Sequence, residues 1–455
     1  MLDIKFNRVS SSDRFIPRRS SANLEASHYL LNERPPSPEY YSYENSEHVN
    51  YAYLNWKQRM YQERLWSLIA PKSQRILNIT ETPQRKTSSN SSAMKLQHWP
   101  VRPRKKPLIG SARIILDMPG LKESINQHMI DWSSKACMAS IYEKEIFFWR
   151  PDEYGPYQGT NTNGQVANCI RWNHLSTHLA LALFNQGIAV LDSSKNQICY
   201  ENLCPCSTKC VITSLAWSSN DLLLSGCALG RLSVWNLQLQ LLKTVYSAHN
   251  SLIITISLSC QERYLVTTSI DCVVRIWIWP EVKEHFEIAH FSPVRSIAWH
   301  PWKDSLLAIG GYSDNGCITL WNVSNHVQVG YKAPPTARSS VDALTWNALT
   351  GELVVSYWEQ PEHSSGAVGQ NYILVFSNFN TVLDSIGWHD GRVLYLLWGD
   401  DGTKLATAGT DESLCIWNFF GNSKETIKIY ENTKKKRNFS ANNFENLLLF
   451  GQTIR

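Results

Sequence analysis

Residues 297–323 read IAWHPWKDSLLAIGGYSDNGCITLWNV, and this stretch decides the fold because it contains two predicted β-strands with their turns. Apolar residues alternate before a polar turn at 301–305, and a short apolar run at 306–309 ends at two glycines. A second alternation then closes at Trp321. Period-two apolar residues bounded by Gly, Pro, Asp and Asn are typical of β-strands joined by turns.

The same unit recurs along the chain, and an aromatic or large apolar residue closes each copy. The closing residues are Trp149, Leu191, Trp235, Trp277, Trp321, Phe376 and Trp417. A second marker lies upstream of each one, at Trp132, Trp172, Trp217, Leu258, Trp299, Trp346 and Trp398. Most steps between closing residues are about 41 to 44 residues, close to the period of a WD repeat. Because one blade cannot bury its own faces, these copies predict an all-β fold, a seven-bladed WD-repeat β-propeller.

The propeller is expected to occupy residues 106–420, between two tails. The N-terminal tail, residues 1–105, is rich in Ser, Asn, Pro, Arg and Glu and shows no strand periodicity. Most of it is expected to be disordered in isolation, because it cannot bury enough apolar surface to offset the entropy of ordering. A short C-terminal tail, residues 421–455, is polar over most of its length.

The strand that closes the ring is expected near the start of the propeller. The segment ARIILDM, residues 112–118, precedes the first complete repeat, whereas the last repeat, ending at Trp417, lacks an outer strand. Pairing the two would remove the exposed edges of the ring. The alternative is ETIKIY, residues 425–430, and we favour the N-terminal strand. A surface insertion near 360–370 explains the one long step between repeats.

Two repeats share a set of polar residues that could suggest catalysis or metal binding. The sets are His249, Asp271 and Trp277, and His389, Asp411 and Trp417. Both sets have the same six-residue step from Asp to Trp. A catalytic or metal-binding site does not usually recur in several blades of one ring. We therefore predict that these residues form hydrogen bonds that hold the blades together.

The composition excludes several classes of protein. The 455 residues carry a formal net charge of +5 and are 43% hydrophobic, which allows a sizeable core but does not indicate nucleic-acid binding. Neither an apolar run of about 18 residues nor a secretory h-region occurs, so no membrane association is expected. No Gly-rich phosphate loop, nucleophile elbow or HExxH string occurs, so an enzyme is not expected.

The 11 cysteines favour a reducing compartment, because they are odd in number and scattered. The one cluster is Cys204, Cys206 and Cys210. A zinc site would need a fourth ligand, and the spacing CxCxxxC is unusual for one. Free loop thiols are the favoured interpretation, so neither a metal nor another cofactor is expected.

Two islands in the N-terminal tail are candidates for docking peptides. In DRFIPRR, residues 13–19, Phe15 and Ile16 lie between arginines, and Pro17 stiffens the segment in an extended form. Apolar anchors fill pockets and arginines pair with carboxylates, although an ordinary basic tail is an equal alternative. Residues 53–69 place apolar side chains on one face of a predicted helix, which favours docking on a partner.

Phosphorylation and nuclear import are two further hypotheses for the tails. Ser37 and Thr82 each precede a proline, and phosphate there would oppose docking of a basic peptide on an acidic surface. The basic runs VRPRKKP at 101–107 and KKKR at 434–437 fit nuclear-import peptides and solvated charge equally well. Localisation in the cytoplasm is expected, and localisation in the nucleus is left open.

Several of these stretches together resemble the Fizzy family, the WD-repeat activators of the anaphase-promoting complex. DRFIPRR resembles the family's C-box, through Asp13, Arg14, Phe15, Ile16, Pro17 and Arg19, with Phe15 in place of the commoner Tyr. RIILDMPGL and IDWSS resemble its first-blade region, residues 297–323 its fifth blade, and Ile454 and Arg455 its Ile-Arg tail. The resemblance covers nearly the whole chain, which looks divergent and most similar to a meiotic branch of the family.

The resemblance implies a substrate-recruiting adaptor without catalytic activity. The C-box and the Ile-Arg tail would bind core subunits of the ubiquitin ligase, and the propeller would bind degron-bearing substrates such as cyclins. Two weak docking peptides on one chain gain affinity through effective concentration. The alternatives are a WD-repeat scaffold without ligase activation and a competitor of other activators.

The resemblance also implies two degron sites. Asp131 matches the acidic residue of the family's DWSS and Glu412 that of its last-blade DE motif, and both would face the arginine of a destruction box. Arg392 and Ser313 match positions of the family's KEN-degron site. The family's fourth-blade Asn-Asp-Asn motif is Ile-Asp-Cys here, at 270–272. Since the lost amides would each remove a hydrogen bond, we predict weak or altered KEN recognition.

Overall fold

The computed structural model describes residues 98–104, 109–121, 128–142, 144–151, 159–162, 164–184, 187–206, 210–312, 316–336, 338–360, 369–399 and 401–421. Several predicted features lie outside these residues: the C-box at 13–19, Ser37, the segment 53–69, Thr82, Ser313, most of the insertion near 360–370, the segment 425–430, the basic run 434–437, Ile454 and Arg455.

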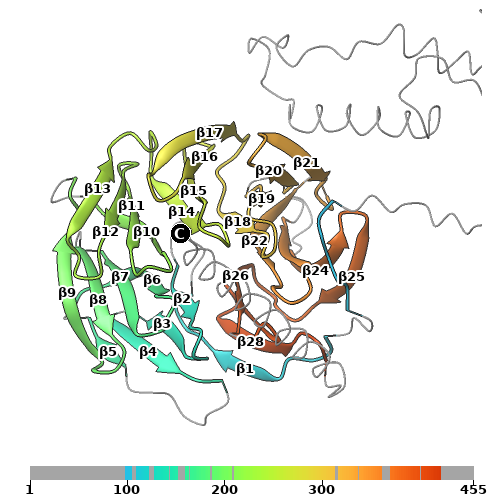
Figure 1. Cartoon of the computed structure of the whole chain (residues 1–455). Helices are drawn as coiled ribbons and strands as arrows, with labels where there is room; N and C mark the ends of the chain where they lie inside the picture. The colour runs from blue at the N-terminus through green and yellow to red at the C-terminus, as the bar shows by residue number, and fades with distance from the viewer. Residues whose placement is uncertain are drawn as a thin grey trace, which may run out of the picture. The chain divides into compact units, whose positions relative to one another are not determined.

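Seven four-stranded antiparallel sheets are arranged around a common axis as the blades of a propeller (Figure 1). The predicted all-β, seven-bladed fold is therefore confirmed. The described residues contain no helix, and so none that is long and apolar enough to cross a membrane.

The strands follow the order of the chain from one blade to the next. Blade 1 contains β2 (Ile130–Trp132), β3 (Met138–Tyr142), β4 (Glu145–Trp149) and β5 (Thr160–Asn161), and blade 2 contains β6 (Ala167–Trp172), β7 (His178–Leu183), β8 (Gly187–Asp192) and β9 (Gln197–Leu203). Blade 3 contains β10 (Ile212–Trp217), β11 (Leu223–Cys227), β12 (Leu232–Trp235) and β13 (Leu241–Val245), and blade 4 contains β14 (Ile253–Leu258), β15 (Tyr264–Ser269), β16 (Val273–Ile278) and β17 (Lys283–Ala289). Blade 5 contains β18 (Ser296–Trp299), β19 (Leu306–Gly310), β20 (Ile318–Asn322) and β21 (Val327–Lys332), and blade 6 contains β22 (Ser339–Trp346), β23 (Leu353–Glu359), β24 (Gln370–Asn378) and β25 (Thr381–Ile386). Blade 7 contains β26 (Val393–Trp398), β27 (Lys404–Gly409), β28 (Ser413–Asn418) and, as its outer strand, β1 (Ile114–Asp117).

Strand β1 closes the ring. It pairs antiparallel with β28, in a register that runs from Ile114 opposite Ile416 to Asp117 opposite Ser413. This confirms the prediction that the strand within 112–118 completes the last blade. Figure 1 shows β1 beside β28 although the two lie at opposite ends of the propeller sequence.

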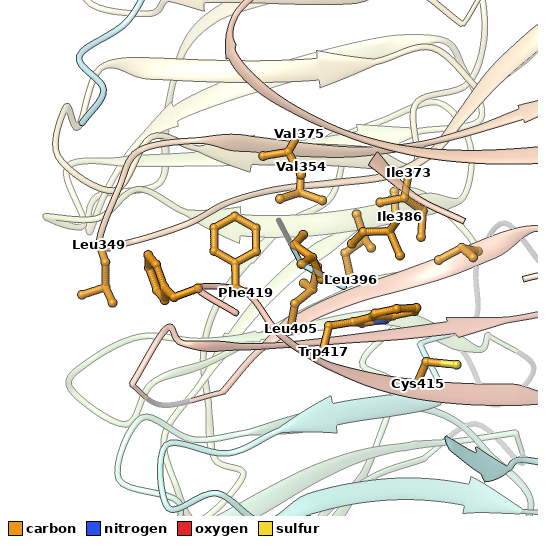
Figure 2. Close-up of a cluster of buried hydrophobic side chains, with 14 residues drawn as sticks. Leu349, Val354, Ile373, Val375, Ile386, Leu396, Leu405, Cys415, Trp417 and Phe419 are labelled. Atoms are coloured by element: carbon orange, nitrogen blue, oxygen red, sulfur yellow. The ribbon is translucent and has the colours of Figure 1, made fainter. Parts of the chain in front are cut away.

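Apolar side chains fill the space between adjacent blades. Between blades 6 and 7, Val354 and Val375 of blade 6 belong to one buried cluster with Leu405, Trp417 and Phe419 of blade 7 (Figure 2). Every closing residue of the sequence repeat lies in the third strand of its blade, and every marker is the last residue of a first strand. The repeated aromatic or large apolar positions therefore correspond to equivalent places in all seven blades.

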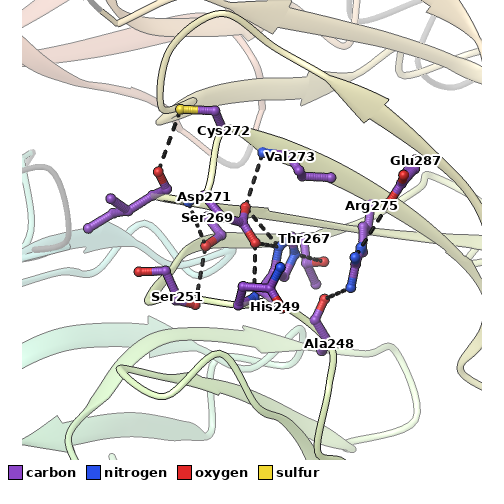
Figure 3. A network of polar contacts seen from close by, with 12 residues as sticks. Ala248, His249, Ser251, Thr267, Ser269, Asp271, Cys272, Val273, Arg275 and Glu287 are labelled. Atoms are coloured by element: carbon purple, nitrogen blue, oxygen red, sulfur yellow. Dashed lines mark hydrogen bonds and ion pairs between the residues drawn. The ribbon is translucent and has the colours of Figure 1, made fainter. Parts of the chain in front are cut away.

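A hydrogen-bonded network ties the loop before β14 to the turn after β15 (Figure 3). His249 Nδ1 lies 3.1 Å from Asp271 Oδ2, and His249 Nε2 lies 2.8 Å from Thr267 Oγ1. Trp277 Nε1 donates to the same hydroxyl at 2.9 Å. The predicted structural role of His249, Asp271 and Trp277 is confirmed, and Thr267 is a fourth member.

Blade 7 repeats this network. His389 Nδ1 lies 3.0 Å from Asp411 Oδ2, and Thr407 Oγ1 contacts both His389 Nε2 at 2.7 Å and Trp417 Nε1 at 2.9 Å. Burial alone would raise the pKa of Asp411, but hydrogen bonds from His389 and Ser413 outweigh it and bring that pKa to about 2. The Asp411 carboxylate is therefore ionised at neutral pH and can hold the histidine in place.

Residues 98–104 pack against the propeller, so the expected boundary between residues 105 and 106 does not coincide with the start of packing. Trp99 is 2% exposed, and its ring centroid lies 5.0 Å from those of Trp346 and Phe379. Its Nε1 donates to the carbonyl of Gly351 at 3.0 Å. The last residues of the expected N-terminal tail thus belong to the folded unit.

Arg104, in the same segment, is a buried cation beside blades 6 and 7. Its Nε and its backbone N–H both donate to the carboxylate of Glu352 at 2.8 Å, and neither side chain has exposed surface. The guanidinium also lies 3.8 Å from the ring centroid of Phe419. Burial raises the pKa of Glu352, and the charge of Arg104 opposes that rise. The basic run 101–107 is therefore not simply a stretch of solvated charge.

Candidate functional site

One face of the propeller carries the loops that lead into the first strands and the turns between the second and third strands, and we call it the top face. These segments share a face because neighbouring strands in an antiparallel sheet run in opposite directions. Arg392 lies on it directly before β26, and Glu412 lies on it between β27 and β28. Asp131 is the middle residue of β2, the first strand of blade 1.

Glu412 is an exposed acidic residue in a turn with left-handed backbone, at φ 59°. Its Oε1 accepts a hydrogen bond from the backbone N–H of Gly120 at 2.9 Å, and its carbonyl accepts one from Met118 at 2.7 Å. Glu412 thereby fastens the link between β1 and β2 to blade 7. A carboxylate has two acceptor oxygens, so the exposed group can also receive a guanidinium N–H.

Asp131 is held by blade 2. Its Oδ2 accepts a hydrogen bond from the backbone N–H of Trp172 at 2.7 Å, and its Oδ1 lies 3.4 Å from Nη1 of Arg171. Burial raises the pKa of Asp131, and the charge of Arg171 opposes that rise. Asp131 therefore faces blade 2, whereas Glu412 faces the link between β1 and β2. An arginine from a ligand would have to compete with Arg171 for Asp131.

Arg392 takes part in a buried ion pair near the top face. Its Nε donates to Asp342 Oδ2 at 3.0 Å, and its Nη2 donates to Asp342 Oδ1 and to the Ser340 hydroxyl. The guanidinium also lies 5.0 Å from the ring centroid of Tyr312. Arg392 is 8% exposed, so most of its surface serves the joint between blades 6 and 7. The family resemblance predicted Arg392 in a degron site, and its pairing with Asp342 was not predicted.

The fourth-blade turn at 270–272 offers little for a polar peptide. The Asp271 carboxylate accepts hydrogen bonds from the backbone N–H groups of Asn250 and Val273 at 3.0 Å, besides its contact with His249. Ile270 is 40% exposed, and the Cys272 thiol is directed at the carbonyl of Ile270 (Figure 3). The turn therefore presents an apolar side chain where the family pattern has an asparagine.

A cavity of about 830 Å³ is lined by none of the predicted degron residues themselves. It is lined by the turn that follows β10, the turn that follows β14 and Trp279, on the face opposite the top face. Arg171 lines this cavity as well as contacting Asp131. Arg171 therefore lies both beside Asp131 and at the cavity.

Comparison with known proteins identifies the family of this chain. The WD domain, G-beta repeat family matches residues 199–236, 240–277, 282–322 and 380–418. The Arabidopsis thaliana protein named Cell division cycle 20.5, cofactor of APC complex, is 26% identical over 435 residues, which cover 91% of this chain and 89% of that protein. Protein cortex of Heliconius erato is 30% identical over 376 residues, which cover 78% of this chain and 80% of that protein. The chain belongs to the Fizzy family.

Family membership agrees with the architecture. A chain of the crystal structure of the mitotic checkpoint complex superposes on the propeller with a TM-score of 0.59, at 23% identity, and the match covers 68% of this chain and 94% of that one. This likeness concerns the fold. The WD-repeat match covers segments in blades 2 to 7, whereas the repeat spacing read from the sequence located all seven blades.

Sequence analysis missed the hydroxyl members of the blade networks. Thr267 and Thr407 each lie ten residues before the closing tryptophan of their blade, and Ser225 occupies the same place before Trp235. This spacing can be read from the sequence, so the network could have been predicted completely. The pairing of Arg392 with Asp342 has no comparable signal, because the two residues are 50 positions apart.

Proposed function

We propose that this protein is a substrate-recruiting adaptor and activator of the anaphase-promoting complex. The observation that carries the proposal is its similarity, over nine-tenths of the chain, to a protein named as a cofactor of that complex. The C-box residues 13–19 and the pair Ile454 and Arg455 are the proposed contacts with core subunits of the ligase. Catalysis of ubiquitin transfer would remain with the ligase, since the adaptor only brings the substrate close.

A pull-down of the ligase core tests the proposal. Wild-type chain is compared with Arg14→Ala plus Ile16→Ala, with a truncation lacking Ile454 and Arg455, and with Arg8→Ala plus Ile4→Ala as a matched control upstream of the C-box. We expect the wild type and the control to capture the ligase and the other two variants to lose most of it, because each peptide adds effective concentration for the other.

Two outcomes would lead to other functions. If no version captures the ligase under conditions in which a known activator does, the chain is a WD-repeat scaffold without a ligase. If the chain binds but does not stimulate ubiquitination of a cyclin, it is a competitor of other activators.

Phosphorylation at Ser37 and Thr82 would be expected to weaken capture of the ligase, because phosphate opposes docking of the basic peptide on an acidic surface.

The proposed destruction-box site consists of Glu412 and Asp131. The exposed Glu412 would receive the degron's arginine first, and Asp131 would join by exchanging its contact with Arg171 for the ligand's guanidinium. Two carboxylates around one guanidinium give charge-assisted, directional hydrogen bonds. The KEN site is proposed to be weak, because Asp271 is engaged within blade 4 and Arg392 within an ion pair.

Binding of fluorescent degron peptides measures both sites. We expect Glu412→Gln to weaken destruction-box binding roughly tenfold or more, because a hydrogen bond to a charged group is lost while the side chain keeps its shape. Glu201→Gln, at an exposed glutamate of β9, is the control and should bind like wild type. Unchanged binding by Glu412→Gln would remove Glu412 from the site. A KEN peptide that binds as tightly as the destruction box would refute the weak KEN site.

The place of action is part of the proposal. We propose the cytoplasm and the nucleus as locations, and meiosis as the setting, on the family resemblance of the sequence. Since Arg104 is buried against Glu352, the run at 434–437 is the better candidate for an import peptide.

A further inference from the structure

Four cysteines converge at one corner between blades 2 and 3. Cys204 and Cys206 follow β9, Cys210 precedes β10, and Cys227 is the last residue of β11. All four sulfur atoms lie within 4.8 Å of one another, and those of Cys206 and Cys227 are 3.6 Å apart. The fourth cysteine of this cluster is Cys227, which lies 17 positions beyond Cys210.

We propose that Cys204, Cys206, Cys210 and Cys227 bind one Zn²⁺ ion as a tetrahedral site of four thiolates. Zn–S bonds of about 2.3 Å in a tetrahedron place the sulfurs about 3.8 Å apart, so the four side chains need only small movements to reach that geometry. A single ion fits, because sulfurs this close leave no room for an iron–sulfur cluster between them. On binding, each thiol gives its proton to solvent and its sulfur to the metal, so four protons leave per ion.

The surroundings of the sulfurs suit thiolates. Backbone groups of Cys206, Leu229 and Arg231 lie near the sulfurs of Cys204, Cys210 and Cys227, respectively, and favour their thiolate forms. The Arg231 side chain lies near Cys206, and its positive charge partly offsets the negative charge of a four-thiolate site. Cys204, Cys210 and Cys227 are buried, which protects a bound ion from exchange with solvent.

The position of the cluster indicates what the ion would do. In blade 4, Ile253 pairs with Ser269 at the corner where His249 and Asp271 tie the loop to the turn. The equivalent strand pair in blade 3 is Ile212 with Cys227. Blade 3 keeps the other half of the network, since Trp235 Nε1 donates to Ser225 Oγ at 2.8 Å. The sulfur cluster thus occupies the corner where blades 4 and 7 use a histidine and an aspartate. Zinc there would join the loop to the turn by metal bonds.

Metal analysis of the purified full chain under reducing conditions tests this inference. We expect one zinc per chain in the wild type, and loss of most of it in Cys227→Ser. Cys415→Ser, at a buried cysteine of β28 outside the cluster, should keep the ion.

Cobalt in place of zinc should give thiolate charge-transfer and tetrahedral d–d absorption bands, and this measurement on the wild type does not depend on the folding of any variant. A zinc chelator should lower the unfolding temperature of the wild type and of Cys415→Ser.

Three results would overturn the site. The first is a folded wild-type chain without zinc and without the cobalt bands. The second is full zinc content in Cys227→Ser. The third is a disulfide between Cys206 and Cys227, found by mass mapping in chain prepared under reducing conditions, since the closest sulfurs would then be used in a covalent bond. None of these results bears on binding to the ligase, so the zinc site and the proposed function can fail separately.

Discussion

Replacing Arg392 with alanine is expected to lower the free energy of unfolding by about 3–5 kcal/mol, because it leaves the carboxylate of Asp342 buried without its counter-ion. The Asp342 side chain has no exposed surface, and that of Arg392 is 9% exposed. Burial raises the pKa of Asp342, and the hydrogen bonds from Arg392 oppose that rise, so the ion pair depends on the arginine. Urea unfolding of the wild type and the variant measures the difference.

Two companion variants separate the ion pair from general effects of losing an arginine. Arg338→Ala removes an exposed arginine just before β22 and should change stability by less than about 0.5 kcal/mol. Arg392→Lys keeps the charge but loses the two-pronged geometry and should fall between the other two. If Arg392→Ala is as stable as Arg338→Ala, the arginine is not structural and is available for a ligand.

Replacing Trp99 with alanine is expected to cost about 3–5 kcal/mol of stability, because it empties a buried space next to blade 6. The indole contacts Trp346 and Phe379 and donates a hydrogen bond to Gly351, so packing and a polar contact are lost together. The measurement is the shift in the midpoint of chemical unfolding.

Trp388→Ala is the matched control for this effect. Trp388 is 54% exposed, so its removal should shift the midpoint little. Equal midpoints for Trp99→Ala and Trp388→Ala would mean that the segment 98–104 rests on the propeller without stabilising it. A large shift for Trp99 alone would mean that a chain cut at the expected boundary of residue 106 lacks part of its core.

The blades were predictable because each repeats the same local rule. An aromatic or large apolar residue ends the first strand and another lies in the third, at places such as Trp299 and Trp321, so seven copies reinforce a weak signal. The closing strand β1 was also predictable, since a blade with three strands requires a fourth. The first prediction rests on a pattern that is local in the sequence, and the second on the number of strands that a blade requires.

Apart from the hydroxyl groups of the blade networks, the contacts that were missed depend on partners further away in the sequence. Arg104 looks like one more residue of a basic run, and only the fold brings it to Glu352, 248 positions later. Asp131 and Glu412 were chosen by resemblance, and nothing in the sequence indicated that Arg171 would already hold Asp131. Cys227 was overlooked as a ligand because it ends a strand at some distance from the other cysteines.

Closing the ring with β1 has a consequence for synthesis. Asp117 leaves the ribosome long before its partner Ser413, which lies 296 positions later, and at about 5–20 residues per second this separation takes roughly 15 to 60 s. Blades 1 to 6 can form in order during this time, each against the one before it. Strand β1 has to wait with an open edge until β28 emerges, so a nascent chain exposes a pairing site that the finished protein hides. Chaperones and competing strands can bind β1 in that interval, which ends when β1 pairs with β28.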